Sequence, residues 1–151
     1  MESHWFYKDE VLNEPPENIH GFVYIIFNRI NNKKYIGRKY FHSVRRIKKK
    51  GSTRRKVTRK ESDWKQYAGS SKNLIGDIEK YGKENFSFHI ISFGETKGQV
   101  NYLEENLQHK FDVLTSHNSE GEKEFYNDSI GNRKFISVKI NESFIKSIKV
   151  I

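Results

Sequence analysis

The chain of 151 residues contains no cysteine, which excludes disulfide bonds and thiolate metal sites. No run approaches the roughly 20 apolar residues of a membrane-spanning helix, and no basic-then-apolar leader opens the chain. Hydrophobic residues make up only 34%, but aromatic residues reach 14% and supply large packing units for a modest core. We therefore expect one cytoplasmic domain without a membrane partner.

Several common catalytic signatures are also missing. The six histidines are scattered without metal-binding spacing, and no glycine-rich phosphate loop follows a strand. Motifs for a serine or cysteine nucleophile are absent too. Basic residues, tyrosines and one acidic helix remain. This set suits phosphodiester hydrolysis, in which a positioned water attacks and electrostatic stabilisation lowers the barrier.

Positive charge is concentrated in one internal segment. Residues 45–60 hold ten Lys and Arg and no acidic residue, whereas the rest of the chain carries 18 basic and 19 acidic residues. Such a segment on a nearly neutral body indicates a polyanionic partner, and nucleic acid is the commonest one. A solvated basic tail fits less well because the run is internal. An anionic membrane surface is the weaker alternative, since the run lacks the apolar face of an interfacial helix.

The hydrophobic pattern predicts strands at 22–27, 34–37 and 86–93, the first two joined as a hairpin through a turn at Asn31-Asn32. A helix is expected after Ser70 or Ser71 as N-cap, with Gly82 as its stop, and a second helix over 100–114. We expect the basic run to be part helix and part loop, broken near Gly51. Helices and strands in this order predict an α/β (α+β) domain with a mostly antiparallel three-stranded sheet.

The expected organisation has three parts. Residues 1–19 form an N-terminal arm in which Trp5, Phe6 and Tyr7 pack against the body. Residues 20–135 form the main domain, with a basic insertion at about 38–67. Residues 136–151 form a short extension that is either a strand or an amphipathic helix.

Two tyrosine motifs carry a resemblance to a known family. Tyr24 in "GFVY", followed by Tyr35-Ile36-Gly37, resembles the two-part signature of the GIY-YIG nuclease superfamily. An arginine past the second tyrosine, a block reading "SSKNLIGDIEKYGKENFSFHII", a glutamate in "LEENLQ" and the asparagine of "FYN" follow in the family's order. The similarity covers about residues 20–130 and is greatest to phage and intron-encoded homing-type members. This resemblance implies the cytoplasm of a bacterium or of a phage-infected host cell.

The resemblance implies an αβα nuclease that uses one divalent metal, usually Mg²⁺, for which Mn²⁺ can substitute. By position, Tyr24 and Tyr35 line the active site and position or deprotonate the attacking water. Arg45 contacts the scissile phosphate, Glu104 binds the metal and Asn127 supports the site. The arginine assignment leaves Arg46 and Arg38 as alternatives, because the chain between the second tyrosine and the next helix is longer than in short family members.

Each assignment has a physical basis and a simpler rival. A tyrosine with a pKa of about 10 is a poor base at pH 7, but a nearby metal and arginine favour its phenolate. Taken alone, a strand tyrosine is usually a packing residue. Glu104 and Glu105 are adjacent on one helix, so only one of them points into the site. The family pattern favours Glu104, because the apolar Leu107 follows it by three residues.

The other basic residues are expected to hold the backbone of double-stranded DNA. They are Arg38, Lys39, Arg46, Lys48, Lys49, Lys50, Arg54, Arg55, Lys56, Arg59 and Lys60. One active site cuts both strands in two events or as a homodimer, and recognition comes from the domain itself, from the insertion or from an accessory partner.

Three functional hypotheses follow. The leading one is a metal-dependent DNA endonuclease, free-standing and of the homing type, with a restriction or repair nuclease sharing the same chemistry. The second is a non-catalytic nucleic-acid-binding module on the same scaffold. The third is a basic RNA- or ribosome-associated protein, which lacks the aromatic stacking residues of single-strand RNA binders in its basic run.

Overall fold

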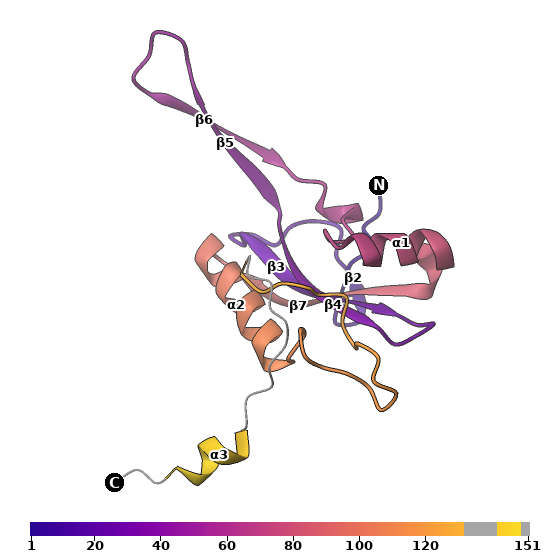
Figure 1. Cartoon of the computed structure of the whole chain (residues 1–151). Helices are drawn as coiled ribbons and strands as arrows, with labels where there is room; N and C mark the ends of the chain where they lie inside the picture. The colour runs from indigo at the N-terminus through magenta and orange to yellow at the C-terminus, as the bar shows by residue number, and fades with distance from the viewer. Residues whose placement is uncertain (132–141, 149–151) are drawn as a thin grey trace.

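The computed structural model describes residues 1–131 and 142–148. Figure 1 shows a twisted sheet with one helix over each face and a two-stranded hairpin that projects from the body. This arrangement confirms the predicted mixed α/β (α+β) class. The elements are β1 Phe6–Tyr7, β2 Glu10–Val11, β3 Gly21–Asn28, β4 Lys34–Tyr40, β5 His42–Lys48, β6 Arg55–Glu61, α1 Lys72–Tyr81, β7 Phe86–Gly94, α2 Lys97–Lys110 and α3 Glu142–Ser147, with single 3-10 turns at Trp64–Gln66 and Lys83–Asn85.

The three predicted strands form the centre of the sheet. Strand β3 lies in the middle and pairs antiparallel with both β4 and β7. The β3–β4 turn contains Asn32 at a φ of +60°, as expected from an asparagine in a left-handed turn position. The sheet order is β2-β1-β7-β3-β4, which leaves β4 as an edge strand.

Two short N-terminal strands widen the predicted three-stranded sheet to five. Strand β1 pairs parallel with β7, and β2 returns antiparallel to β1. Trp5, just before β1, is fully buried and its indole N–H donates to the backbone carbonyl of Trp64 at 2.6 Å. Trp5 and Tyr7 of the N-terminal segment therefore pack against the body, whereas Phe6, which was expected to do the same, is 40% exposed.

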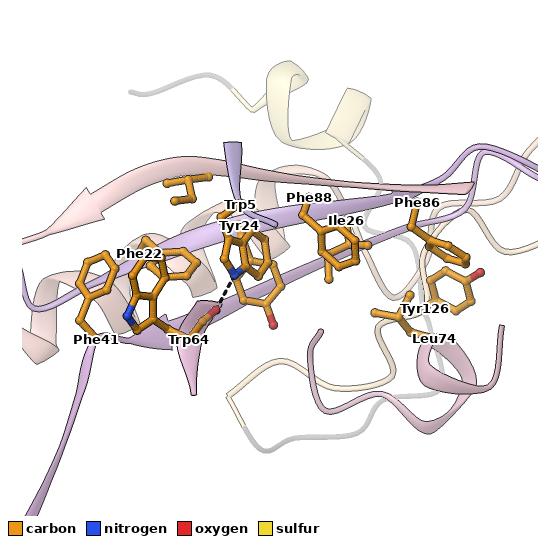
Figure 2. Close-up of a cluster of buried hydrophobic side chains, with 11 residues drawn as sticks. Trp5, Phe22, Tyr24, Ile26, Phe41, Trp64, Leu74, Phe86, Phe88 and Tyr126 are labelled. Carbon is orange, nitrogen blue, oxygen red and sulfur yellow. Dashed lines mark hydrogen bonds between the residues drawn. The ribbon is translucent and has the colours of Figure 1, made fainter. Parts of the chain in front are cut away.

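Side chains alternate along β3 and so build a core on each face of the sheet. Phe22, Tyr24 and Ile26 point toward α1 and join a mostly aromatic cluster that includes Trp5 and Trp64 (Figure 2). The intervening residues Val23 and Ile25 point the other way and pack with α2. The two helices thus cover opposite faces, which is the predicted αβα layering.

The helix boundaries follow from local sequence signals. Ser71 caps α1 by accepting a hydrogen bond from the Leu74 amide, and the helix ends at Gly82, as predicted. Helix α2 begins earlier than expected because Thr96 provides its N-cap. Ile75 of α1 and Phe111, which follows the last residue of α2, are 40% and 54% exposed.

The basic segment does not have the conformation that was predicted for it. Residues 42–61 form an antiparallel β-hairpin, β5–β6, with its turn around Gly51 at a φ of +84°. The prediction of a part-helical segment was wrong because the β-branched residues Val44, Ile47 and Val57 favour strand conformation among the lysines and arginines. The predicted break near Gly51 is the hairpin turn.

The C-terminal extension lies partly outside the described residues, which include only its helix α3. Among the described residues, no helix is long and apolar enough to span a membrane.

Candidate active site

A cleft of about 960 Å³ runs along the edge strand β4. Because no other strand of the sheet lies beyond β4, apart from an isolated bridge between Lys34 and Phe125, side chains from both of its faces border the cleft. Tyr35 and Lys39 come from the α1 face of this strand, whereas Arg38 and Tyr40 come from the α2 face. Of the residues predicted for the site, the lining includes Tyr24, Tyr35, Arg38, Lys39, Glu104 and Asn127.

The two tyrosines of the sequence motif meet in this cleft. Tyr24 pairs with Gly37 in the β3–β4 register, which places its ring on the same face as Tyr35, and the two ring centroids are 6.2 Å apart. Tyr24 is only 1% exposed. The Tyr35 hydroxyl instead reaches the open side, where it shares a hydrogen bond of 3.3 Å with the Ser70 hydroxyl.

Two glycines make room for the phenols. A Cβ atom on Gly37 would lie 2.5 Å from the Tyr24 hydroxyl oxygen and 2.9 Å from the Tyr35 ring. A Cβ atom on Gly69, whose φ is +88°, would lie 3.4 Å from the same oxygen and 3.0 Å from the Tyr35 ring. The Tyr24 hydroxyl therefore lies between two backbone segments without side chains, which explains the glycine that closes the second motif.

Both phenols are protonated at neutral pH in this environment. Burial raises the pKa of Tyr24 well above its usual value, and the neighbouring tyrosines and Glu104 add to the shift while Arg38 opposes it. Burial also raises the pKa of Tyr35, against a lowering contribution from its hydrogen bond to Ser70. The expected fall in tyrosine pKa is thus not produced by the protein side chains. As neutral hydroxyls, the phenols donate and accept hydrogen bonds.

An ion pair joins β4 to α2 at the other side of the cleft. The Arg38 guanidinium donates to Glu104 Oε1, and its Nε donates to the Tyr40 hydroxyl at 3.1 Å. Tyr40 in turn donates to the side-chain carbonyl of Asn101 on α2. Since the charged fork of Arg38 is held at both ends, its guanidinium has a defined orientation.

Burial distinguishes the two adjacent glutamates. Glu104 is 8% exposed, whereas Glu105 is exposed. Burial raises the pKa of the Glu104 carboxyl, although the positive charge of Arg38 acts in the opposite direction. The ionised carboxylate is therefore only partly compensated by the protein, and a further cation beside it would be favourable.

The cleft has donor groups that fit a hard, hydrated cation. Among the described residues, no group of three or more acidic or histidine side chains gathers into a metal cage. Glu104 is the buried carboxylate of the cleft, whose lining also includes the exposed Glu105 and Asp128. One or two carboxylates are a common arrangement for Mg²⁺, which keeps several of its waters. One helical turn later, Gln108 has a buried side-chain oxygen without a hydrogen-bond partner, suited to accept from such a water. These groups fit the divalent metal that the family resemblance implies.

Asn127 and Gln108 hold the edge strand at its centre. The Asn127 side chain accepts from the Ile36 amide at 3.0 Å and donates to the Ile36 carbonyl at 2.7 Å. Gln108 donates to the same carbonyl at 3.0 Å. These bonds satisfy the peptide groups that β4 would otherwise leave unpaired at the sheet edge, so Asn127 positions the strand that carries Tyr35 and Arg38.

The structure does not bring Arg45 into the cleft. Arg45 lies on β5, is exposed, and is not among the residues that line the cleft. Arg46 is likewise exposed on the hairpin. Arg38, the remaining alternative, is the one in contact with Glu104. Arg45 lies outside the cleft because the chain leaves it after Phe41 and enters the hairpin.

Sequence reasoning missed several residues of the cleft, among them Tyr40, Gln108 and Tyr67. Tyr40 orients Arg38, and Gln108 supports β4. The centroid of the Tyr67 ring lies 3.9 Å from the Lys39 ammonium, which also forms an ion pair with Asp63. Strand periodicity was a usable signal for Tyr40, since it lies two residues after Arg38. Helical spacing was a usable signal for Gln108, which follows Glu104 by four residues on the same helix. No local signal marked Tyr67.

One of three comparisons with known proteins found a match. The profile of the family described as "Putative endonuclease segE, GIY-YIG domain" matches residues 5–130, a range that includes the whole sheet, both covering helices and every cleft residue named above. A search of the curated proteins and a search of the solved structures found no match.

Proposed function

Because the chain belongs to the GIY-YIG family of endonuclease domains, we propose that it is a divalent-metal-dependent endonuclease that hydrolyses phosphodiester bonds in double-stranded DNA. One observation carries this proposal. A single cleft holds the oriented Arg38 guanidinium, the buried Glu104 carboxylate and the hydroxyl of Tyr35. These are a phosphate-binding group, a cation-binding group and a group that can orient water, which are the requirements of phosphodiester hydrolysis.

In this proposal Arg38 binds the scissile phosphate. Guanidinium forks match phosphate oxygens in geometry and charge, and 40% exposure of the Arg38 side chain leaves it accessible from the cleft. Its ion pair with Glu104 keeps it in place before DNA arrives. The role that the sequence resemblance gave to Arg45 therefore moves to Arg38.

Glu104 is the residue that would hold the metal, with Gln108 accepting a hydrogen bond from its hydration shell. When bound, Mg²⁺ or Mn²⁺ supplies positive charge that stabilises the charge developing on the phosphate oxygens. The raised pKa of Glu104 supports this role, because a cation relieves the cost of ionising the buried carboxyl.

The two phenols have different tasks. Tyr35 has its hydroxyl on the open side of the cleft, so it orients the attacking water by hydrogen bonding. Tyr24 is fully enclosed and packs behind Tyr35, so it fixes the ring position. A neutral phenol performs both tasks, and neither requires the phenolate.

We assign the biological role of a free-standing homing-type nuclease on the resemblance of the motif order to such members. The same cleft chemistry would also serve the alternative role of a restriction or repair nuclease. With one such site among the described residues, cutting both strands requires two successive events or a homodimer.

Cleavage of supercoiled plasmid tests the proposal. The protein should nick or linearise the plasmid with Mg²⁺ or Mn²⁺ and stop on addition of EDTA. Sequencing the ends produced on genomic DNA then reports the cut site and stagger. Salt-sensitive binding without cleavage in Mg²⁺, Mn²⁺ and Co²⁺ would overturn the proposal in favour of the non-catalytic binding module.

A further inference from the structure

The hairpin β5–β6 is exposed along its length. Figure 1 shows it projecting from the sheet and helices, and its residues are exposed except for His42, Ser52 and Thr58, which are half-buried. An isolated two-stranded hairpin is only marginally stable in water, so a partner surface is expected to complete it.

The hairpin carries positive charge on both faces. Directly opposed residues share a face, so the register assigns Arg46, Lys48, Arg55 and Arg59 to one face and Arg45, Lys56 and Lys60 to the other. Lys49, Lys50 and Arg54 lie at the turn. A two-stranded ribbon that lay on a flat anionic surface would need positive charge on one face only. Positive charge on both faces of the hairpin instead matches a groove that has phosphates along both walls.

The dimensions select the major groove of B-form DNA. That groove is about 12 Å wide and admits a two-stranded ribbon, whereas the minor groove, at about 6 Å, is too narrow. Each strand of the ladder has seven residues. At about 3.4 Å per residue a strand of this length covers roughly 20 Å, or about six base pairs.

Exposed apolar side chains interrupt the charge on both faces: Val44 and Val57 lie on the face of Arg46, and Ile47 lies on the other. Val44, Ile47 and Val57 are 52%, 52% and 60% exposed, although they are β-branched residues that normally pack. Their methyl groups are chemically suited to the C5-methyl group of thymine, which is presented only in the major groove.

The base of the hairpin is fastened beside the cleft. Phe41, fully buried, links β4 to β5, and its carbonyl accepts from the Ser62 amide at 2.9 Å. The Ser62 hydroxyl donates to the Tyr40 carbonyl at 2.6 Å, and Glu61 accepts from the Trp64 indole at 2.9 Å. His42, the first residue of β5, lines the cleft. The ribbon thus starts at the proposed cutting site and leads away from it.

We propose that β5–β6 enters the major groove of duplex DNA as a two-stranded ribbon, on one side of the scissile phosphate, and reads about six base pairs there. This inference rests on the proposed function for the identity of the substrate, but it concerns binding and is tested without cleavage.

Binding is measured with the Glu104→Gln variant in EDTA on a DNA duplex that contains a mapped cut site, or on random duplex if no cutting is found. Methyl green, which occupies the major groove, should displace the protein, and the minor-groove ligand netropsin should not. On the duplex with a mapped cut site, methylation of guanine N7 should interfere over about six base pairs on one side of the cut. Displacement by netropsin alone, or equal affinity for duplex RNA, whose major groove is too narrow, would overturn the inference.

A charge-matched pair of variants separates the hairpin from general electrostatics. Changing Arg46, Lys48, Arg55 and Arg59 together to Gln should lower the slope of log K against log salt by about three to four, because each phosphate contact contributes about 0.9. The control removes the same charge from exposed lysines elsewhere, Lys80, Lys97, Lys110 and Lys146. Equal slopes for the two variants would overturn the inference. DNA binding through the hairpin without any cleavage would instead overturn the proposed function alone.

Discussion

The guanidinium of Arg38 donates to the carboxylate of Glu104, so a residue of the edge strand β4 and a residue of α2, 66 positions apart, form one charged pair in the cleft. Both groups are individually suited to a phosphate-cleaving site, one for phosphate and the other for a cation. Their contact in the DNA-free protein means that each holds the other in position until substrate and metal separate the pair.

Arg38 should be essential for the chemical step. We expect Arg38→Gln to lower the single-turnover cleavage rate at saturating protein by about 10²- to 10³-fold, because a charge that stabilises the transition state is lost. Arg45→Gln should weaken DNA binding and keep the saturated rate, since Arg45 lies on the exposed hairpin. A lower saturated rate for Arg45→Gln, together with an unchanged saturated rate for Arg38→Gln, would instead assign the phosphate contact to Arg45.

Tyr35 should contribute through its hydroxyl. Tyr35→Phe keeps the ring that packs against Tyr24 but removes the group that faces the open cleft. We expect the saturated rate to fall by about 10²-fold with little change in thermal stability. Tyr102→Phe on the exposed side of α2 is the matched control and should cut normally. A normal rate for Tyr35→Phe would remove the hydroxyl from the mechanism.

Gly37 should be intolerant of a side chain. The added methyl group of Gly37→Ala would meet the Tyr24 hydroxyl oxygen at 2.5 Å, so the phenol or the strand must move. We expect a loss of about 1–3 kcal/mol in the free energy of unfolding, measured by chemical denaturation, together with reduced cleavage. Gly76→Ala is the control. It has no neighbour within 4 Å and lies inside α1, so it should stabilise the protein by about 0.5–1 kcal/mol.

His4 should make stability depend on acidic pH. Its ring stacks on Phe88 and its Nε2 donates to the Tyr67 carbonyl, while burial lowers its pKa to about 4. The unfolded chain therefore binds more protons between pH 6.5 and 4, and stability is full above pH 6.5 and falls through that window. Allowing for partial exposure of the ring, we expect a loss of about 1–2 kcal/mol.

The control for this pH dependence is His4→Phe, which keeps the stacking and cannot titrate. Chemical denaturation at pH 4, 5, 6 and 7 should give a shallower pH profile for the variant than for the wild-type protein. Parallel profiles would assign the acid sensitivity to other groups.

Local chemistry explains which features were predictable from the sequence. Ser71 and Gly82 bound α1 through capping and φ preference, and the apolar run of β3 pairs as expected, because these signals act within a few residues. The hairpin was misjudged because charge dominates its composition, whereas its conformation follows the β-branched residues Val44 and Ile47.

The contacts of the site depend on tertiary structure. The pairing of Arg38 with Glu104 requires that β4 be the sheet edge and that α2 cross it, neither of which is encoded in nearby residues. Counting along the chain selected Arg45 for the same reason, since distance in sequence does not show where the chain leaves the cleft. The pKa of each tyrosine likewise depends on burial that only the folded chain defines.

The most direct test of the central claim compares Glu104→Gln with Glu105→Gln in Mg²⁺-dependent plasmid cleavage and thermal melting. Because burial raises the pKa of Glu104, its ionisation costs stability, and this cost grows as the pH rises through that pKa. At neutral pH without metal, Glu104→Gln should therefore melt at the same temperature as the wild-type protein or higher, and should not cleave. Glu105→Gln should cleave normally. A folded Glu104→Gln protein that cuts DNA at the wild-type rate would contradict the account.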